Sequence, residues 1–112
     1  MKKEIYITDY NCVTPLGFNV DSNWNALLEG QSGVALHKII DNQEAFYTSM
    51  IDSDELNEEF NRFFAQHTTD FTRLEKMLLL SLQPLVEKHT VSESTAFILS
   101  TTKGNISLLK NQ

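Results

Sequence analysis

The feature that most constrains the fold is a long stripe of apolar side chains in the second half of the chain. Its members recur at three- and four-residue spacing, as on one face of an α-helix: Phe71, Leu74, Met77, Leu78, Leu82 and Leu85. Leu79 and Leu80 widen the stripe, so we predict a largely buried central helix that begins near Thr69. Pro84 has no backbone donor, and we expect it to kink or end this helix, with irregular geometry from about Leu82 onward.

A short helix is predicted near the start of the chain. Three apolar residues at positions i, i+3 and i+4 define one face of a helix over residues 22–29: Trp24, Leu27 and Leu28. Asp21 or Ser22 is expected to cap its N-terminus, because short polar side chains accept hydrogen bonds from the free amides there. Gly30 is expected to cap its C-terminus.

A second apolar stripe predicts another helix or helical turn over residues 56–64: Leu56, Phe60, Phe63 and Phe64. Asp52, Ser53 and Asp54 are candidate caps. The nearby carboxylates lack the alternate spacing and the glycine of a calcium loop, so we interpret them as solvated charges near the helix N-terminus: Asp52, Asp54, Glu55, Glu58 and Glu59. The stripe either packs on a sheet or forms a bare patch for self-association.

Three segments have the composition of β-strands. Residues 4–13 begin with β-branched and aromatic side chains, and the Thr-Pro-Leu-Gly turn at residues 14–17 ends the strand. Residues 46–51 alternate in part, and residues 95–100 form a short apolar run typical of a strand covered on both faces. Residues 35–43 have no period and are expected to form a loop.

Strands and helices alternate along the chain, which predicts an α/β fold with a parallel or mixed sheet of about three strands and packing helices. We expect one domain over residues 1–112 without an internal boundary. A loop over residues 101–105 leads into a further helix that begins at Ile106. So small a sheet leaves an open edge, so we expect self-association and a longer parent polypeptide beyond Gln112.

Composition argues against several classes of partner. The formal charge of −6 has no basic stripe, so nucleic acid is not expected to bind. The longest apolar run is the four residues 77–80, whereas a membrane span needs roughly 20, so we expect a cytoplasmic protein without membrane contact. The single cysteine and the widely spaced His37, His67 and His89 form no zinc pattern, and no metal or cofactor is expected.

Three features suggest catalytic or nucleotide-binding chemistry only superficially. Cys12 has no base or helix N-terminus nearby in the sequence, so we interpret its thiol as a packing group and not a nucleophile. Lys103 lies beside Gly104, but the glycines of a phosphate-binding loop are missing. His67 and Asp70 are spaced like an acid–base pair, yet they are more simply a polar loop that ends at the cap of the central helix.

Four segments, taken in order, resemble the N-terminal part of the β-ketoacyl-[acyl carrier protein] synthases of the thiolase-like superfamily. "IYITDYNCVTPLG" is similar to the family's opening strand and turn, and "NWNALLEGQSGV" to its tryptophan-containing helix and Gly-x-Ser-Gly exit. "DFTRLEKMLLLSLQPLV" is similar to its long helix, and "AFILSTTKGNI" to its next strand and glycine-containing loop. The resemblance covers nearly the whole chain.

The resemblance implies a partial thiolase-like fold from an acyltransferase that joins acyl chains by decarboxylative Claisen condensation, with acyl carrier protein as partner. The family's reactive cysteine and two histidines lie downstream of the matched region, so no catalytic residue is expected in this chain. The loop that matches residues 100–104 approaches the acyl channel near the subunit interface in the family, which makes Thr102 and Lys103 the candidate substrate-binding residues.

Two departures from the family pattern concern the substrate. Asp9, Tyr10 and Asn11 replace a glycine-rich turn, and Lys103 places a charge where the family loop is apolar. These departures favour a specialised or polyketide-like branch over ordinary fatty acid synthesis. The alternative hypothesis is a self-contained, non-enzymatic domain that uses the same framework for binding or assembly.

Overall fold

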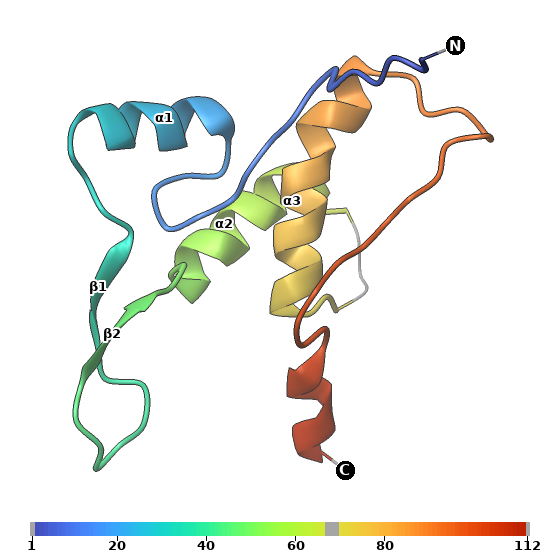
Figure 1. Cartoon of the computed structure of the whole chain (residues 1–112). Helices are drawn as coiled ribbons and strands as arrows, with labels where there is room; N and C mark the ends of the chain where they lie inside the picture. The colour runs from blue at the N-terminus through green and yellow to red at the C-terminus, as the bar shows by residue number, and fades with distance from the viewer. Residues whose placement is uncertain (1, 67–69, 112) are drawn as a thin grey trace. The chain divides into compact units, whose positions relative to one another are not determined.

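The structure is a computed structural model of the 112-residue chain, and it describes residues 2–66 and 70–111. The described residues form an α/β arrangement, which confirms the predicted class. Its elements are shown in Figure 1: α1 (Val20–Leu28), β1 (Val34–His37), β2 (Phe46–Ser49), α2 (Ser53–Phe64), α3 (Arg73–Lys88) and the 3-10 helix η1 (Ile106–Asn111).

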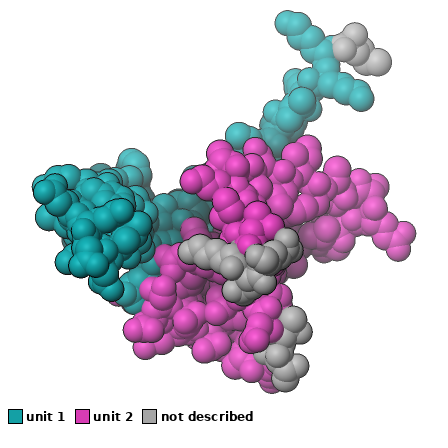
Figure 2. Space-filling model, turned by 90° about the horizontal axis from the view of Figure 1, so that it is seen from below, with its two compact units in different colours: residues 1–52 teal, residues 53–112 magenta. Residues whose placement is uncertain are grey.

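The chain forms two compact units, residues 1–52 and residues 53–112, which Figure 2 shows in two colours. The first unit holds α1 and the β1–β2 hairpin, and the second holds α2, α3 and η1. The expectation of one domain over residues 1–112, without an internal boundary, stays a prediction.

The Thr-Pro-Leu-Gly turn predicted at residues 14–17 is confirmed. The Thr14 amide donates to the Gly17 carbonyl at 2.9 Å, and the Gly17 amide donates back to the Thr14 carbonyl at 3.0 Å. A Cβ atom at Gly17 would lie 2.5 Å from Cβ of Ser22, so only glycine fits this close approach between the turn and α1.

Helix α1 confirms the predicted helix, but its N-cap is Asn19 and not Asp21 or Ser22. Asn19 has extended backbone angles, and its side-chain oxygen accepts from the Ser22 amide at 2.8 Å, so the helix begins before the predicted caps. Gly30 confirms the predicted C-terminal cap with φ of 75°. Two hydrogen bonds of a Schellman motif close the helix, from Gly30 N to Leu27 O at 3.0 Å and from Gln31 N to Ala26 O at 2.9 Å.

The three residues predicted to form the apolar face of α1 are exposed, and two other residues of the helix are buried instead. Trp24, Leu27 and Leu28 are all exposed, whereas Asn23 and Ala26 are buried. Asn23 is fully satisfied, because its amide donates to the Gly17 carbonyl at 3.1 Å and the Asn19 carbonyl at 2.8 Å, and its side-chain oxygen accepts from the Thr14 hydroxyl. A polar side chain therefore joins the turn to the helix.

The sheet of the described residues is a single antiparallel pair. Strand β2 confirms the first four residues of the strand expected at residues 46–51. It pairs with β1 in a register that runs from Val34–Ser49 to His37–Phe46. The expected loop over residues 35–43 was wrong at its start, because β1 occupies Val34–His37. Residues 34–37 show no two-residue period; they form a strand because β2 lies opposite them.

The parallel or mixed sheet of about three strands is not confirmed. Within residues 2–66 and 70–111, the segments 4–13 and 95–100 contain no strand, although both are rich in β-forming residues. A strand exists only when a neighbour completes its hydrogen-bond ladder, and none of the described residues pairs with either segment. The strands predicted at residues 4–13 and 95–100 are therefore not confirmed, because a β-forming composition does not by itself supply a pairing partner.

The core of the second unit lies between α2 and α3, which pack against each other. Leu56, Phe60 and Leu80 are its buried apolar side chains. The Phe60 ring stacks on Phe64 at 4.8 Å between centroids and meets the edge of Phe71 at 5.3 Å. The predicted phenylalanine stripe therefore packs on a helix, not on a sheet, and only Phe63 is left exposed, at 48%.

Polar contacts complete this helix pair. Lys76 of α3 lies 5.6 Å from the centroid of the Phe60 ring and donates to Asn57 Oδ1 at 2.7 Å. The acidic side chains of α2 include two in its first turn, Asp54 and Glu55, as expected for favourable charges at a helix N-terminus. Glu59 pairs with Arg62 at 3.0 Å.

Helix α3 confirms the central helix, with a different cap and end. Its N-cap is Thr72 and not Asp70, because Thr72 and Glu75 form a capping box: the Glu75 amide donates to Thr72 Oγ1 at 3.2 Å, and the Thr72 amide donates to Glu75 Oε1 at 3.1 Å. Thr69, the predicted start, lies outside the described residues. The helix passes through Pro84 and ends at Lys88, so Pro84 does not end it.

The last element begins where the sequence predicted it. Residues 101–105 form the expected loop, and a helical segment starts at Ile106, although it is a 3-10 helix. The loop turns at Gly104, whose φ of 54° lies in the left-handed region that glycine adopts readily. This loop places Asn105 beside the start of α3.

Candidate functional site

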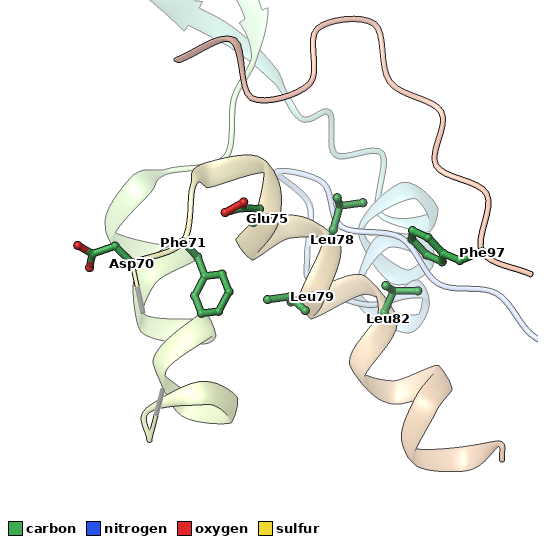
Figure 3. Close-up of a pocket in the computed structure, with 7 residues that line it drawn as sticks. All are labelled: Asp70, Phe71, Glu75, Leu78, Leu79, Leu82 and Phe97. Atoms are coloured by element: carbon green, nitrogen blue, oxygen red, sulfur yellow. The ribbon is translucent and has the colours of Figure 1, made fainter. Parts of the chain in front are cut away.

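An open groove of about 510 Å³ runs along α3 in the second unit. Its lining is mostly apolar, with two carboxylates, as Figure 3 shows: Asp70, Phe71, Glu75, Leu78, Leu79, Leu82 and Phe97. Helix α3 supplies the four residues at the i, i+3, i+4 and i+7 positions from Glu75, so they share one helical face. Phe71 precedes the helix, and Phe97 comes from the extended segment that returns past it.

The apolar part of the groove is bounded by aromatic side chains. In Figure 3 the Phe97 ring lies beside Leu78 and Leu82, and Leu79 points toward Phe71. Phe97 is more than half exposed, so the groove is open to solvent along the 97–99 segment. Such a surface can bury apolar groups of a partner molecule, and it is an open groove.

The polar end of the groove is already hydrogen-bonded. Glu75 Oε1 accepts from the Thr72 amide, and its Oε2 accepts from Asn105 Nδ2 at 3.2 Å. The Thr72 hydroxyl donates to Asn105 Oδ1 at 2.7 Å, which closes a triangle of three residues. Glu75 therefore positions the 101–105 loop at the start of α3 and is not free to act as a general base.

Asp70 contributes a charge at the rim. Its side chain is exposed, and Figure 3 shows it pointing away from the groove. His67, its suggested acid–base partner, lies outside the described residues. The groove thus offers an apolar floor with one solvated carboxylate at its edge.

The two candidate substrate-binding residues lie apart from the groove lining. Thr102 and Lys103 are exposed in the 101–105 loop, and neither lines the groove. The Thr101 hydroxyl oxygen accepts from the Gly104 amide at 3.1 Å, which fixes the loop from within. Asn105 connects this loop to Glu75 through a hydrogen bond. The substrate-binding role suggested for Thr102 and Lys103 stays a prediction.

Cys12 is half-buried in the extended stretch before the 14–17 turn. Among the residues that the structure describes, its thiol has no hydrogen-bond or ion-pair partner. The described part of the chain also holds no group of three or more His, Cys, Asp or Glu side chains arranged for a metal ion.

Sequence reasoning missed the groove, although part of its pattern was visible. The residues of α3 that line it belong to the apolar stripe that predicted the helix, and we had expected that stripe to be buried. The sequence predicts a covered strand at Phe97, whereas the structure places this side chain beside Leu78 and Leu82, which are far from it in the sequence. Nothing local in the sequence records that contact.

No protein-family model matches this chain, and no curated protein or solved structure matches it either. Among the described residues, no helix is both long and apolar enough to cross a bilayer.

Proposed function

We propose that this chain forms the N-terminal portion of a β-ketoacyl-[acyl carrier protein] synthase, with a thiolase-like parallel or mixed sheet in the complete enzyme. The proposal rests first on the four matching segments in their order along the chain. The 14–17 turn is hydrogen-bonded, α1 ends in a glycine cap before Ser32 and Gly33, and α3 is the longest helix of the described residues. These are the local structures that the resemblance calls for.

The observation that most supports the proposal is the state of the two β-prone segments. Residues 5–8 and 97–99 correspond to the family's first two strands, and both are exposed. Neither has a hydrogen-bonded strand partner in the part of the chain that the structure describes. Further strands and a covering layer, as in a ketosynthase sheet, would satisfy both segments.

In this proposal the chain serves a structural role in chain elongation. The parent is a cytoplasmic, dimeric acyltransferase of fatty acid or polyketide-type synthesis, and acyl carrier protein presents its substrates. The reactive cysteine and the two histidines belong to the downstream part. Thr102 and Lys103 border the acyl channel, and the charge of Lys103 favours an acyl group with polar substituents over a plain fatty chain.

Sequencing the transcript beyond the codon for Gln112, together with the intact mass of the native product, tests this proposal. A continuing reading frame that encodes a cysteine at a strand-to-helix elbow and two later histidines is the expected result. A stop codon directly after Gln112, with a native mass that matches 12.8 kDa, would overturn it.

The role of Cys12 can be tested in the native full-length product. Cys12→Ala is expected to leave acyl condensation unchanged, because among the described residues this thiol has no hydrogen-bond or ion-pair partner. Alanine at the downstream elbow cysteine is the matched comparison and is expected to abolish condensation. Loss of turnover in a folded Cys12→Ala protein would show that the nucleophile lies in this chain.

A second candidate function is non-enzymatic assembly, and one observation favours it. Large apolar side chains are exposed on both units, including Trp24 and Tyr47 in the first and Phe97 and Ile98 in the second. Exposed apolar groups in such number mark an interaction surface. A stop codon after Gln112 would favour this function over the first.

A further inference from the structure

Two short segments, residues 5–8 and residues 97–99, have the composition of β-strands but are not paired with another strand in the described structure. Ile5 and Ile7 are 92% and 86% exposed, and Ile98 is 89% exposed. Within residues 2–66 and 70–111, no backbone hydrogen bond reaches residues 5–8 or 97–99. An extended segment with free amides and carbonyls and with apolar side chains is a template for another strand.

A hydrogen bond within the first segment places two of its alternate side chains together. The Tyr6 hydroxyl donates a hydrogen bond to the Glu4 carboxylate, so these two residues share one face. That hydrogen bond raises the pKa of Tyr6 above its ordinary value. Because successive side chains of an extended segment point to opposite faces, Ile5 and Ile7 lie together on the other face. The segment therefore presents one polar-aromatic face and one purely aliphatic face.

The second segment borders the apolar groove of α3. Phe97 lines the groove together with Leu78 and Leu82. In a strand, Leu99 would share the face of Phe97, because side chains two residues apart point the same way. A peptide that adds a strand to an exposed edge gains affinity from main-chain hydrogen bonds and specificity from pockets for alternate side chains. Residues 97–99 supply the free edge, and the groove supplies the pocket.

Charge complementarity points to the occupant. Lys2 and Lys3 lie before the aliphatic segment, separated from it by Glu4, and both lysines are exposed. The exposed Asp70 lies at the rim of the groove, and the exposed Glu93 precedes the 97–99 edge. The basic end of the first segment thus matches the acidic surroundings of the second, although the chain as a whole carries a charge of −6.

We propose that residues 97–99 and the groove beside them accept residues 5–8 of a second copy of this chain as an added β-strand, with Ile5 and Ile7 in the groove. The exchange is reciprocal, because each copy has one donor segment and one acceptor edge, and two such contacts close a dimer with two-fold symmetry. This inference concerns the polypeptide of residues 1–112 and rests on its exposed segments; in the complete synthase proposed above, the same segments would pair with further strands instead.

Sedimentation velocity of the full chain over a range of concentrations tests the dimer. The wild-type chain is expected to shift from monomer to dimer as its concentration rises. Ile7→Asp removes an aliphatic side chain from the groove-facing side, and we expect it to weaken the dimer at least about tenfold. Tyr6→Asp is the matched control, because it makes a comparable change at the next residue on the opposite face, and it should leave the dimer nearly intact.

A synthetic peptide of residues 2–9 separates this contact from other modes of association. The labelled peptide is expected to bind the Ile7→Asp chain, whose acceptor edge is intact, and to dissociate the wild-type dimer. A wild-type chain that stays monomeric at its highest soluble concentration would overturn the proposal. So would equal dimerisation of the two variants, or a dimer that the peptide does not disturb. Far-UV circular dichroism of each variant confirms that its helices are retained.

Discussion

The α2–α3 pair and the extended segment that follows it belong to the same unit, yet they differ in where their hydrogen bonds are made. Each helix bonds to itself, and the pair buries Leu56, Phe60 and Leu80 between two elements close in sequence. Residues 97–99 have no such bonds in the described structure, and their side chains are largely exposed. A helix makes its backbone hydrogen bonds within its own segment, whereas a strand makes them with a neighbouring strand.

The first unit repeats this contrast. The 14–17 turn and α1 are joined through Asn23 within about ten residues of chain, and every polar atom of that side chain is engaged. Residues 5–8 lie just before the turn and have no backbone partner among the described residues. Both units thus combine a locally satisfied helical part with an unsatisfied β-prone segment, and the following predictions test that division.

The largest effect is expected in the helical core. Phe60 is 5% exposed and contacts Phe64, Phe71 and Lys76, whereas Phe63 of the same helix is 48% exposed. Phe60→Ala should destabilise the second unit by about 3–5 kcal/mol, because it leaves a cavity between α2 and α3. Phe63→Ala makes the same chemical change and should cost much less. Urea unfolding followed by circular dichroism measures both, and similar losses would show that α2 is not packed as described.

The next effect concerns the buried amide of the first unit. Asn23→Ala removes the side chain that joins the Thr14 hydroxyl with the Gly17 and Asn19 carbonyls, and it should cost about 1–3 kcal/mol. Asn25 is exposed on the same helix, and Asn25→Ala should change stability by no more than about 0.5 kcal/mol. Fluorescence of Trp24, the single tryptophan of the chain, reports unfolding of this unit.

The same division explains how much of the structure the sequence could predict. The spacing of apolar residues located α1, α2 and α3, and Gly30 marked the end of α1, because these features depend on neighbours within one or two turns. The N-caps were misplaced by a few residues: several short polar side chains compete near each start, and backbone geometry selected Asn19 and Thr72.

Strand pairing and the groove could not be predicted in the same way. β1 gains its strand structure from β2, across a loop whose residues showed no period. The groove joins α3 to Phe97, and its polar end joins Glu75 to Asn105, residues 30 positions apart. Such pairings are decided by tertiary contacts, which hydrophobic patterns alone do not encode.

A smaller effect is expected at the start of α3. Thr72→Ala removes the oxygen that accepts from the Glu75 amide and the hydroxyl that donates to Asn105, and it should cost about 0.5–2 kcal/mol. Thr72→Ser keeps both interactions and is expected to retain most of the stability. Amide hydrogen exchange in the first turn of α3 should rise in the alanine variant only. Equal exchange in the two variants would mean that the capping box contributes little.

The smallest effect is expected in the extended segment, and it bears most directly on the contrast between the two regions. Ile98 is exposed and lies on the face opposite Phe97 and the groove, so Ile98→Ser removes an aliphatic side chain that contacts little. Measured by urea unfolding at a concentration where the chain is monomeric, its cost should stay within about 0.5 kcal/mol. A buried isoleucine would cost several times more on the same change, because its apolar area would be lost from a core. A loss of unfolding free energy of that size at Ile98 would mean that residues 97–99 are covered in the monomer. The segment would then be paired with another strand of the same chain.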